Sequence, residues 1–275
     1  MIEVNFLLPI SIFIVTVLSI LLHKKVAEKV KEVFGDKKIS LREVIIIVIF
    51  MGILVTMIGL IPDYAIQALF IVAFSYTIFI FSYLFSRKAI LSMIPPIIFI
   101  TVLLLLNYFL MENILAVILI TDIFSASFAI IIITLVGPLF SWKVMIIFSA
   151  LLTIMDIIHV FITGHMIEAA NKVMVLGLPL MLLLPRLPSM RGVTVLGLGD
   201  VFLSGLLSTR IASKYGSKSG LLAAASISVV FLVFDIIISN FAQYTGAFPA
   251  TLLVLIGWFL GISPYILKRK GKKIV

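Results

Sequence analysis

The chain contains no cysteine, which excludes disulfides, thiolate zinc sites and cysteine nucleophiles. It also carries little charge: only 12% of its 275 residues are Asp, Glu, Lys or Arg, while 63% are hydrophobic. The mean hydropathy of +1.33 is far from that of a soluble domain. Acidic residues are fewer than basic ones, 12 against 21. The positive charge is not accompanied by the interleaved aromatic and basic residues that are typical of nucleic-acid-binding surfaces. We therefore predict a polytopic membrane protein and expect no nucleic acid partner.

Long apolar runs fill most of the sequence, and a transmembrane helix needs about 20 such residues. The first run follows an acidic N-terminus and continues to Leu22 without a cleavage site, so we predict a first span rather than a removable signal. The predicted fold is all-α, a single membrane domain over 1–275 with nine transmembrane helices. The predicted spans are 4–22, 44–61, 65–86, 89–111, 113–140, 144–163, 194–210, 220–240 and 249–267. Spans one to six thus lie in 1–163, an outer connection in 164–193, and spans seven to nine with a basic tail in 194–275.

The basic residues predict an orientation. With the N-terminus outside and the C-terminus in the cytoplasm, 18 of the 21 basic residues lie on inner connections or in the tail, and only Lys172, Arg186 and Arg191 lie outside. The run "VMVLGLPLMLLL" from Val173 to Leu184 is too short to cross as a helix, and we expect a re-entrant or interfacial, strand-like segment. The tail "KRKGKK" is expected to hold the last helix against anionic lipid.

Four aspartates lie within predicted spans: Asp122, Asp156, Asp200 and Asp235. Ionisable groups inside a membrane are rare and indicate function, although a structural hydrogen bond is the alternative for each of them. At a rise of about 1.5 Å per residue all four fall in the outer half of the bilayer, so depth permits a pair without selecting it. Asp122 and Asp235 have serines nearby but no adjacent glycine, and structural or tuning roles are expected for both.

The local sequence distinguishes the other two aspartates. Asp200 follows Gly197-Leu198-Gly199, in which two glycines allow a backbone or a substrate to approach the carboxylate closely. Asp156 lies in "LLTIMDIIHVF", with Thr153 and His159 three residues to either side on the same helix face. His159 is expected to be a hydrogen-bonded packing residue.

The order of three short motifs adds a resemblance. "MD" in the sixth span, "GLGD" in the seventh and "FPAT" at the start of the ninth resemble the presenilin and signal peptide peptidase family of intramembrane aspartyl proteases. The connection "HMIEAANKVMVLGLPLMLLLPR" is similar to that of the family as well. Two positions depart from the family pattern: its usual tyrosine before the first aspartate is Met155 here, and its Pro-Ala-Leu is Pro249-Ala250-Thr251, with Leu252 next.

By this resemblance, Asp156 and Asp200 form a catalytic dyad. Two carboxylates close together in a low dielectric share one proton, so the pair can activate a water molecule without a metal, a cofactor or a covalent intermediate. The residues that the resemblance places against the substrate are Gly197, Leu198, Gly199, Pro249, Ala250, Thr251 and Leu252. The implied substrates are transmembrane helical peptides or proteins, including remnant signal peptides.

A substrate helix must be unwound before its carbonyls can react, and its freed backbone then needs new partners. The segments Gly177–Leu184 and Pro249–Thr251 are expected to supply them by adding the substrate as a strand. Three alternatives stay open: a prepilin or preflagellin peptidase, which also uses a Gly-x-Gly-Asp aspartate; an ion-coupled transporter or channel; and a membrane scaffold without chemistry. The oligomeric state is left open by the sequence.

Overall fold

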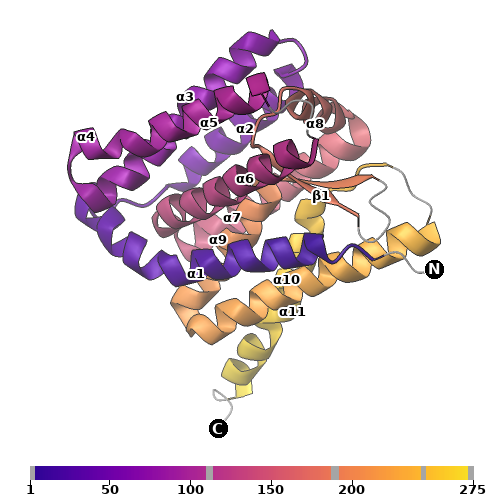
Figure 1. The fold of residues 1–275 in the computed structure, drawn as a ribbon. Coiled ribbons are helices and arrows are strands. Elements are labelled where there is room, and N and C mark those ends of the chain that lie inside the picture. The colour runs from indigo at the N-terminus through magenta and orange to yellow at the C-terminus, as the bar shows by residue number, and fades with distance from the viewer. Residues whose placement is uncertain (1–3, 110–113, 187–191, 243–245, 272–275) are drawn as a thin grey trace.

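The computed structural model of the chain (Figure 1) describes residues 4–109, 114–186, 192–242 and 246–271. Its α-helices are α1 (Leu7–Phe34), α2 (Leu41–Met57), α3 (Asp63–Ser86), α4 (Ala89–Ser92), α5 (Ile94–Phe109), α6 (Ile114–Val136), α7 (Trp142–Ile157), α8 (His165–Val175), α9 (Leu198–Tyr215), α10 (Ser217–Ile237) and α11 (Ala250–Gly271). A 3-10 turn, η1 (Gly137–Leu139), follows α6, and π-helical turns, η2 (Ile158–Ile162) and η3 (Ile238–Ala242), follow α7 and α10. Two strands, β1 (Met181–Pro185) and β2 (Val193–Gly197), precede α9.

The chain is an α-helical membrane protein. In the part of the chain that the structure describes, six helical segments are long and apolar enough to cross a bilayer, and a shorter apolar helix covers Ala250–Tyr265. The six are Leu7–Phe34, Asp63–Ser86, Ala89–Leu106, Leu115–Leu139, Trp142–Ile162 and Ser217–Phe241. The predicted spans 44–61 and 194–210 overlap α2, which has 17 residues, and α9, which has 18.

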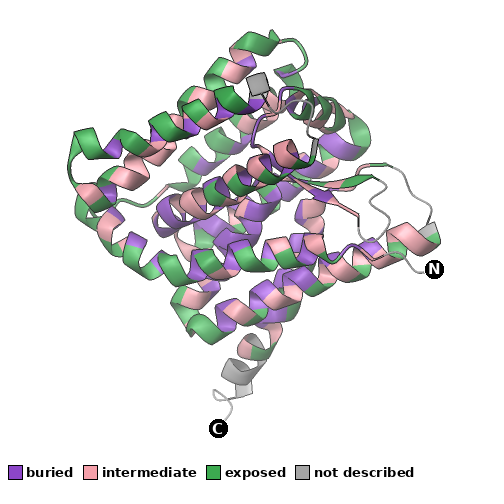
Figure 2. Cartoon of the chain, viewed as in Figure 1, coloured by how far each residue is buried: buried purple, intermediate pink, exposed green. Residues whose placement is uncertain are grey.

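The outer helices expose apolar side chains, as expected for a surface that lies against lipid. Figure 2 shows exposed residues over much of α3 and α5, and these faces carry large side chains such as Val72, Tyr76 and Leu104. In water such a surface would be a strong aggregation site, whereas acyl chains are as apolar as these side chains. The exposed hydrophobic surface therefore agrees with a bilayer environment.

Helix α9 lies at the centre of the bundle. It packs against α1, α6, α10 and α11, and its side chains Leu203, Leu206 and Leu207 are fully buried. Thr16 of α1 and Ser204 of α9 share a hydrogen bond of 3.1 Å between their hydroxyls, which satisfies two polar groups inside the core. Asp200 is therefore carried by the most enclosed helix of the protein.

Helices α10 and α11 approach each other closely because glycines on α11 face α10. A β-carbon at Gly257 would lie 2.4 Å from the Cα of Ile227, and one at Gly261 would lie 2.6 Å from the Cα of Ala223. Two glycines four residues apart form the small-residue face that lets membrane helices pack backbone to backbone. This contact fixes the position of α11, whose first turn reaches the candidate site.

The two strands correct the expected start of the seventh helix. Segment 194–210 was predicted to be helical throughout, but Val193–Gly197 is strand β2, and it pairs antiparallel with β1 in the register Leu183 to Val195. The β-branched residues Val193, Thr194 and Val195 favour an extended chain. Pairing with β1 supplies backbone hydrogen bonds that a helix would otherwise supply.

The expectation for Val173 to Leu184 is partly confirmed. Residues 181–184 belong to β1, as a strand-like segment predicts, whereas Val173–Val175 form the end of the helix α8. Arg191, which was predicted to lie outside, and Lys272 and Lys273 of the basic tail fall outside the described residues.

Candidate functional site

Asp156 and Asp200 are brought together by two helix ends. Asp156 is the second-last residue of α7, which the π-helical turn η2 follows, and Asp200 is the third residue of α9. Both side chains are buried, and the charge of Asp156 acts on the carboxyl group of Asp200. Two buried acids from different helices are thus close enough to interact electrostatically.

Thr251 holds the Asp156 carboxylate. Its hydroxyl donates a hydrogen bond of 2.7 Å to Oδ2 of Asp156, and its backbone N–H lies 3.4 Å from the same oxygen. Thr251 is buried in the first turn of α11, where backbone N–H groups have no partner within the helix. The residue that departs from the family's Pro-Ala-Leu therefore acts on the candidate dyad directly, a role that sequence reasoning missed.

The two glycines before Asp200 occupy different surroundings. A β-carbon at Gly197 would lie 3.1 Å from Oδ2 of Asp200, so a side chain there would press on the carboxylate. A β-carbon at Gly199 would have no atom within 4 Å, so the space beside Gly199 is open. Gly197 therefore allows the position of Asp200, and Gly199 leaves room next to it.

This difference gives a prediction for Gly199→Val. The side chain would fill open space, so we expect the melting temperature in detergent to stay within a few degrees of the wild-type value. If the chain cleaves transmembrane peptides and its substrate occupies that space, cleavage should fall about tenfold or more, because a small displacement of a reacting group costs much rate. A Gly199→Val variant that cleaves such a peptide at the wild-type rate would show that this space is not used for substrate.

The remaining residues expected at the substrate have separate positions. Leu198 is buried, and its backbone N–H donates a hydrogen bond of 2.9 Å to the carbonyl of Leu180, so it extends the hairpin into α9. Pro249 is buried directly before α11, and its carbonyl accepts a hydrogen bond of 3.1 Å from the N–H of Leu252. Ala250 and Leu252 lie half-buried in the first turn of the same helix. The segment Pro249–Thr251 is therefore a helix start and not a strand.

Asp122 fixes strand β1. Its Oδ1 accepts a hydrogen bond of 2.6 Å from the backbone N–H of Leu183, and Ser125, one helical turn later on α6, donates one of 2.8 Å to the carbonyl of Met181. Both bonds go to the edge of β1 that faces away from β2. Asp122 thus has the structural role expected for it, and the outer edge of β1 already has partners.

We predict that Asp122→Ala destabilises the protein by about 1–3 kcal/mol, because it leaves the Leu183 N–H without an acceptor. Asp122→Asn retains a carbonyl oxygen that can accept this hydrogen bond, so it should lose much less stability. Thermal unfolding in detergent, followed by circular dichroism, measures both. Equal melting temperatures for wild type and Asp122→Ala would show that this bond does not anchor the hairpin.

Asp235 also has a structural partner. Its Oδ2 accepts a hydrogen bond of 3.1 Å from the backbone N–H of Asn5, and the Asn5 side-chain amide donates one of 3.0 Å to the hydroxyl of Thr194. The three residues join α10, the segment before α1 and strand β2. This bonding agrees with the structural role expected for Asp235.

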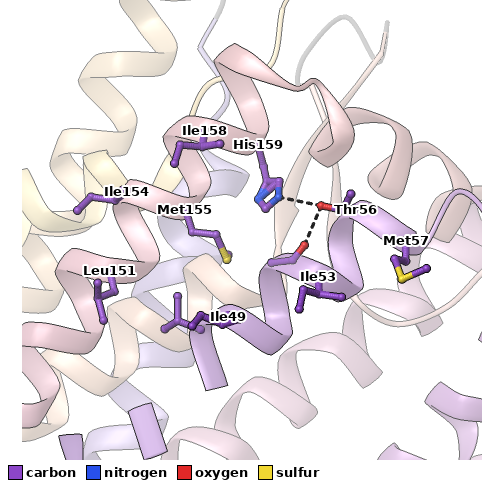
Figure 3. A pocket seen from close by; sticks show the side chains of 11 residues that line it. Ile49, Ile53, Thr56, Met57, Leu151, Ile154, Met155, Ile158 and His159 are labelled. Atoms are coloured by element: carbon purple, nitrogen blue, oxygen red, sulfur yellow. Dashed lines mark hydrogen bonds between the residues drawn. The ribbon is translucent and has the colours of Figure 1, made fainter. Parts of the chain in front are cut away.

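His159 is buried beside an apolar groove between α2 and α7 (Figure 3). Its Nε2 and the hydroxyl of Thr56 are 3.2 Å apart, so the imidazole links η2 to α2 through a hydrogen bond, as expected of a packing histidine. The groove has a volume of about 430 Å³. Met155, which stands where the family usually has tyrosine, lines this groove and packs on Gly52, with its sulfur 3.4 Å from the position of a β-carbon there.

Among the described residues, no group of three or more His, Asp or Glu side chains is arranged to hold a metal ion. The polar side chains at the ends of α7, α9 and α11 include Asp156, Asp200 and Thr251, and His159 of η2 acts electrostatically on Asp156. Comparisons with known proteins give no match: no protein family model, no curated protein and no solved structure is similar to this chain at a significant level.

Proposed function

We propose that this protein is an intramembrane aspartyl protease, which hydrolyses peptide bonds within transmembrane segments or remnant signal peptides. The observation that carries the proposal is the pair of buried carboxylates, Asp156 near the end of α7 and Asp200 in the first turn of α9, of which the first acts electrostatically on the second. Neither has a lysine or arginine within ion-pair distance among the described residues. A pair of this kind is a functional arrangement by default, because unpaired acids are costly inside a membrane.

The proposed reaction needs one proton shared between the two acids. The ionised carboxylate removes a proton from a water molecule, the water oxygen bonds to the scissile carbonyl carbon, and the protonated acid donates its proton to the carbonyl oxygen. In the resulting diol, the aspartate that took the proton from water gives it to the nitrogen as the C–N bond breaks, and the other aspartate, now ionised, takes a proton from one diol hydroxyl. This leaves a carboxylic acid and an amine and restores the shared proton. Thr251 keeps Oδ2 of Asp156 in a fixed position throughout these steps.

The β2 edge gives an unwound substrate a place to bind. In the hairpin, Leu198 N–H bonds to Leu180 and Arg186 N–H bonds to Gly192, so the even-numbered residues of β1 bond across to β2. By the same alternation, Val193 and Val195 direct their backbone N–H and C=O groups away from β1. No partner for these groups is found among the residues that the structure describes, and both side chains are exposed.

An extended peptide can add to this edge as a third strand, which replaces the hydrogen bonds lost on unwinding. The edge runs toward Asp200, since Gly197 ends β2 and a β-carbon there would nearly touch the carboxylate. Because α6 occupies the outer edge of β1, we assign the substrate to β2 rather than to the segment Gly177–Leu184.

The proposal includes a topology of nine spans. Helices α2, α9 and α11 would complete the six apolar segments, with the N-terminus outside and the C-terminus in the cytoplasm, as the distribution of basic residues indicates. Substrates would then be single-span segments whose N-terminus lies inside. The bilayer is the second partner of the protein.

Incubation of the purified protein in detergent with a helical single-span peptide tests the function. We expect internal cleavage within the apolar segment, detected by mass spectrometry, and inhibition by hydroxyl-containing mimics of the tetrahedral intermediate. A folded preparation that leaves several such peptides intact, both in detergent and in liposomes, would contradict the proposal.

A further inference from the structure

A second polar site lies away from the aspartates, between the C-terminal halves of α1 and α9. It is a cavity of about 610 Å³, closed on one side by the loop after α1 and by η1. Arg210 lies ten residues beyond Asp200 on α9, which places it about 15 Å from that residue along the helix axis. The cavity is therefore distinct from the candidate active site.

The cavity is strongly basic. Five cations line it, against two acids, Glu28 and Asp36, and Asp36 is already paired with Lys31 at 3.0 Å. The cations are Lys24, Lys31, Lys37, Lys38 and Arg210. Since like charges repel, their gathering around one cavity is favourable when an anion lies between them.

Two enclosed groups in the cavity have no protein partner. Arg210 makes no hydrogen bond or ion pair with any described residue, and its Nε is completely buried. His23 is 8% exposed and lines the cavity, its Nδ1 has no hydrogen-bond partner, and both Arg210 and Lys38 act on it electrostatically. The Nε of Arg210 and the Nδ1 of His23 are buried without a hydrogen-bond partner, which costs free energy that a bound anion would recover.

We propose that this cavity binds a phosphate group, and that in the membrane this group is the headgroup of an anionic lipid. A phosphate offers several acceptor oxygens in the geometry that the guanidinium fork of Arg210 matches, and Lys24 and Lys38 add point charges. The same cavity is lined by the apolar side chains of Ile20, Ala27 and Leu139, which suit the acyl end of a lipid. A free phosphate would use the polar half alone.

Binding to purified protein in a nonionic detergent, measured by native mass spectrometry, tests this proposal. The probes are phosphatidic acid, diacylglycerol with the same chains, and inorganic phosphate. We expect phosphatidic acid to bind and diacylglycerol not to bind. Arg210→Gln should weaken the binding of phosphatidic acid about tenfold or more, since a hydrogen bond to a charged group is lost. Inorganic phosphate that binds with the same dependence on Arg210 would identify the ligand as a soluble phosphate.

Lys25→Gln is the matched control, because it removes the same charge from the neighbouring position on α1, where Lys25 lies 5.8 Å from the centre of the Phe85 ring and not in the cavity. It should leave binding within about twofold. The double variant Lys24→Gln, Lys37→Gln changes only exposed side chains, and should weaken phosphatidic acid about tenfold even if Arg210→Gln does not fold. Equal affinities for all folded variants, or no binding of either phosphate probe, would overturn the proposal.

Discussion

Asp156→Asn and Asp200→Asn are each expected to reduce peptide cleavage by more than about 10³-fold. Each substitution keeps the shape of the side chain but removes a proton acceptor or donor that the reaction requires, and general acid and base catalysis contributes about 10²–10⁴-fold for each group. Because the two residues act as one unit, the double variant should be no slower than either single variant. The measurement is the rate of product formation from a single-span peptide at saturating substrate.

Asp235→Asn is the control for these variants. It changes a third buried aspartate in the same half of the protein, and the amide oxygen can still accept the hydrogen bond from Asn5. We expect its cleavage rate to stay within about threefold of wild type, because the substitution weakens one hydrogen bond outside the proposed dyad without removing it. If Asp235→Asn is inactive while Asp156→Asn retains activity, the dyad has been assigned to the wrong residues.

Thr251→Val is expected to lower kcat about 10²-fold and to leave KM nearly unchanged. The variant keeps the volume of the side chain and removes only the hydroxyl that binds Oδ2 of Asp156 at 2.7 Å. A carboxylate that loses its fixed position samples unproductive geometries, and a misplacement of about 1 Å can cost 10² in rate. Thr251 is a positioning residue in this scheme, since it acts through Asp156.

Thr251→Ser distinguishes this role from simple packing. Serine retains the hydroxyl but loses a methyl group, so it should recover most of kcat while its melting temperature falls slightly. A packing role would give the opposite order, with Thr251→Val active and Thr251→Ser impaired. Both variants are compared with wild type by steady-state kinetics and thermal unfolding in the same detergent.

The site depends on three helix ends that are far apart in the sequence. Asp156 lies in the last turn of α7, and Asp200 and Thr251 lie in the first turns of α9 and α11. A π-helical turn follows α7, and strand β2 precedes α9. The backbone next to such ends is less constrained than in a helix interior, so polar groups and a substrate can reach it there. This arrangement explains how a hydrophobic bundle offers polar chemistry within its core.

The sequence by itself determined the class of the protein and drew attention to the acids. Hydropathy is a property of each segment alone, so the apolar runs predict membrane helices whatever their neighbours are. The free-energy cost of a carboxylate inside a membrane also depends only on the segment that carries it. It therefore identifies Asp122, Asp156, Asp200 and Asp235 as candidate functional residues before any contact is known. The strand at 193–197 was missed, because a short apolar run reads alike as helix or strand until its partner is known.

Only the tertiary structure decided which acid has which partner. The bond between Thr251 and Asp156 joins residues 95 positions apart, and that between Asp122 and Leu183 joins residues 61 apart. Such contacts depend on how helices pack, which small residues such as Gly257 set by allowing close approach at particular points. The position of an acid within its span gives its depth in the bilayer. Its neighbours on other helices depend on the rotation and crossing angle of every helix, which no single segment of the sequence encodes.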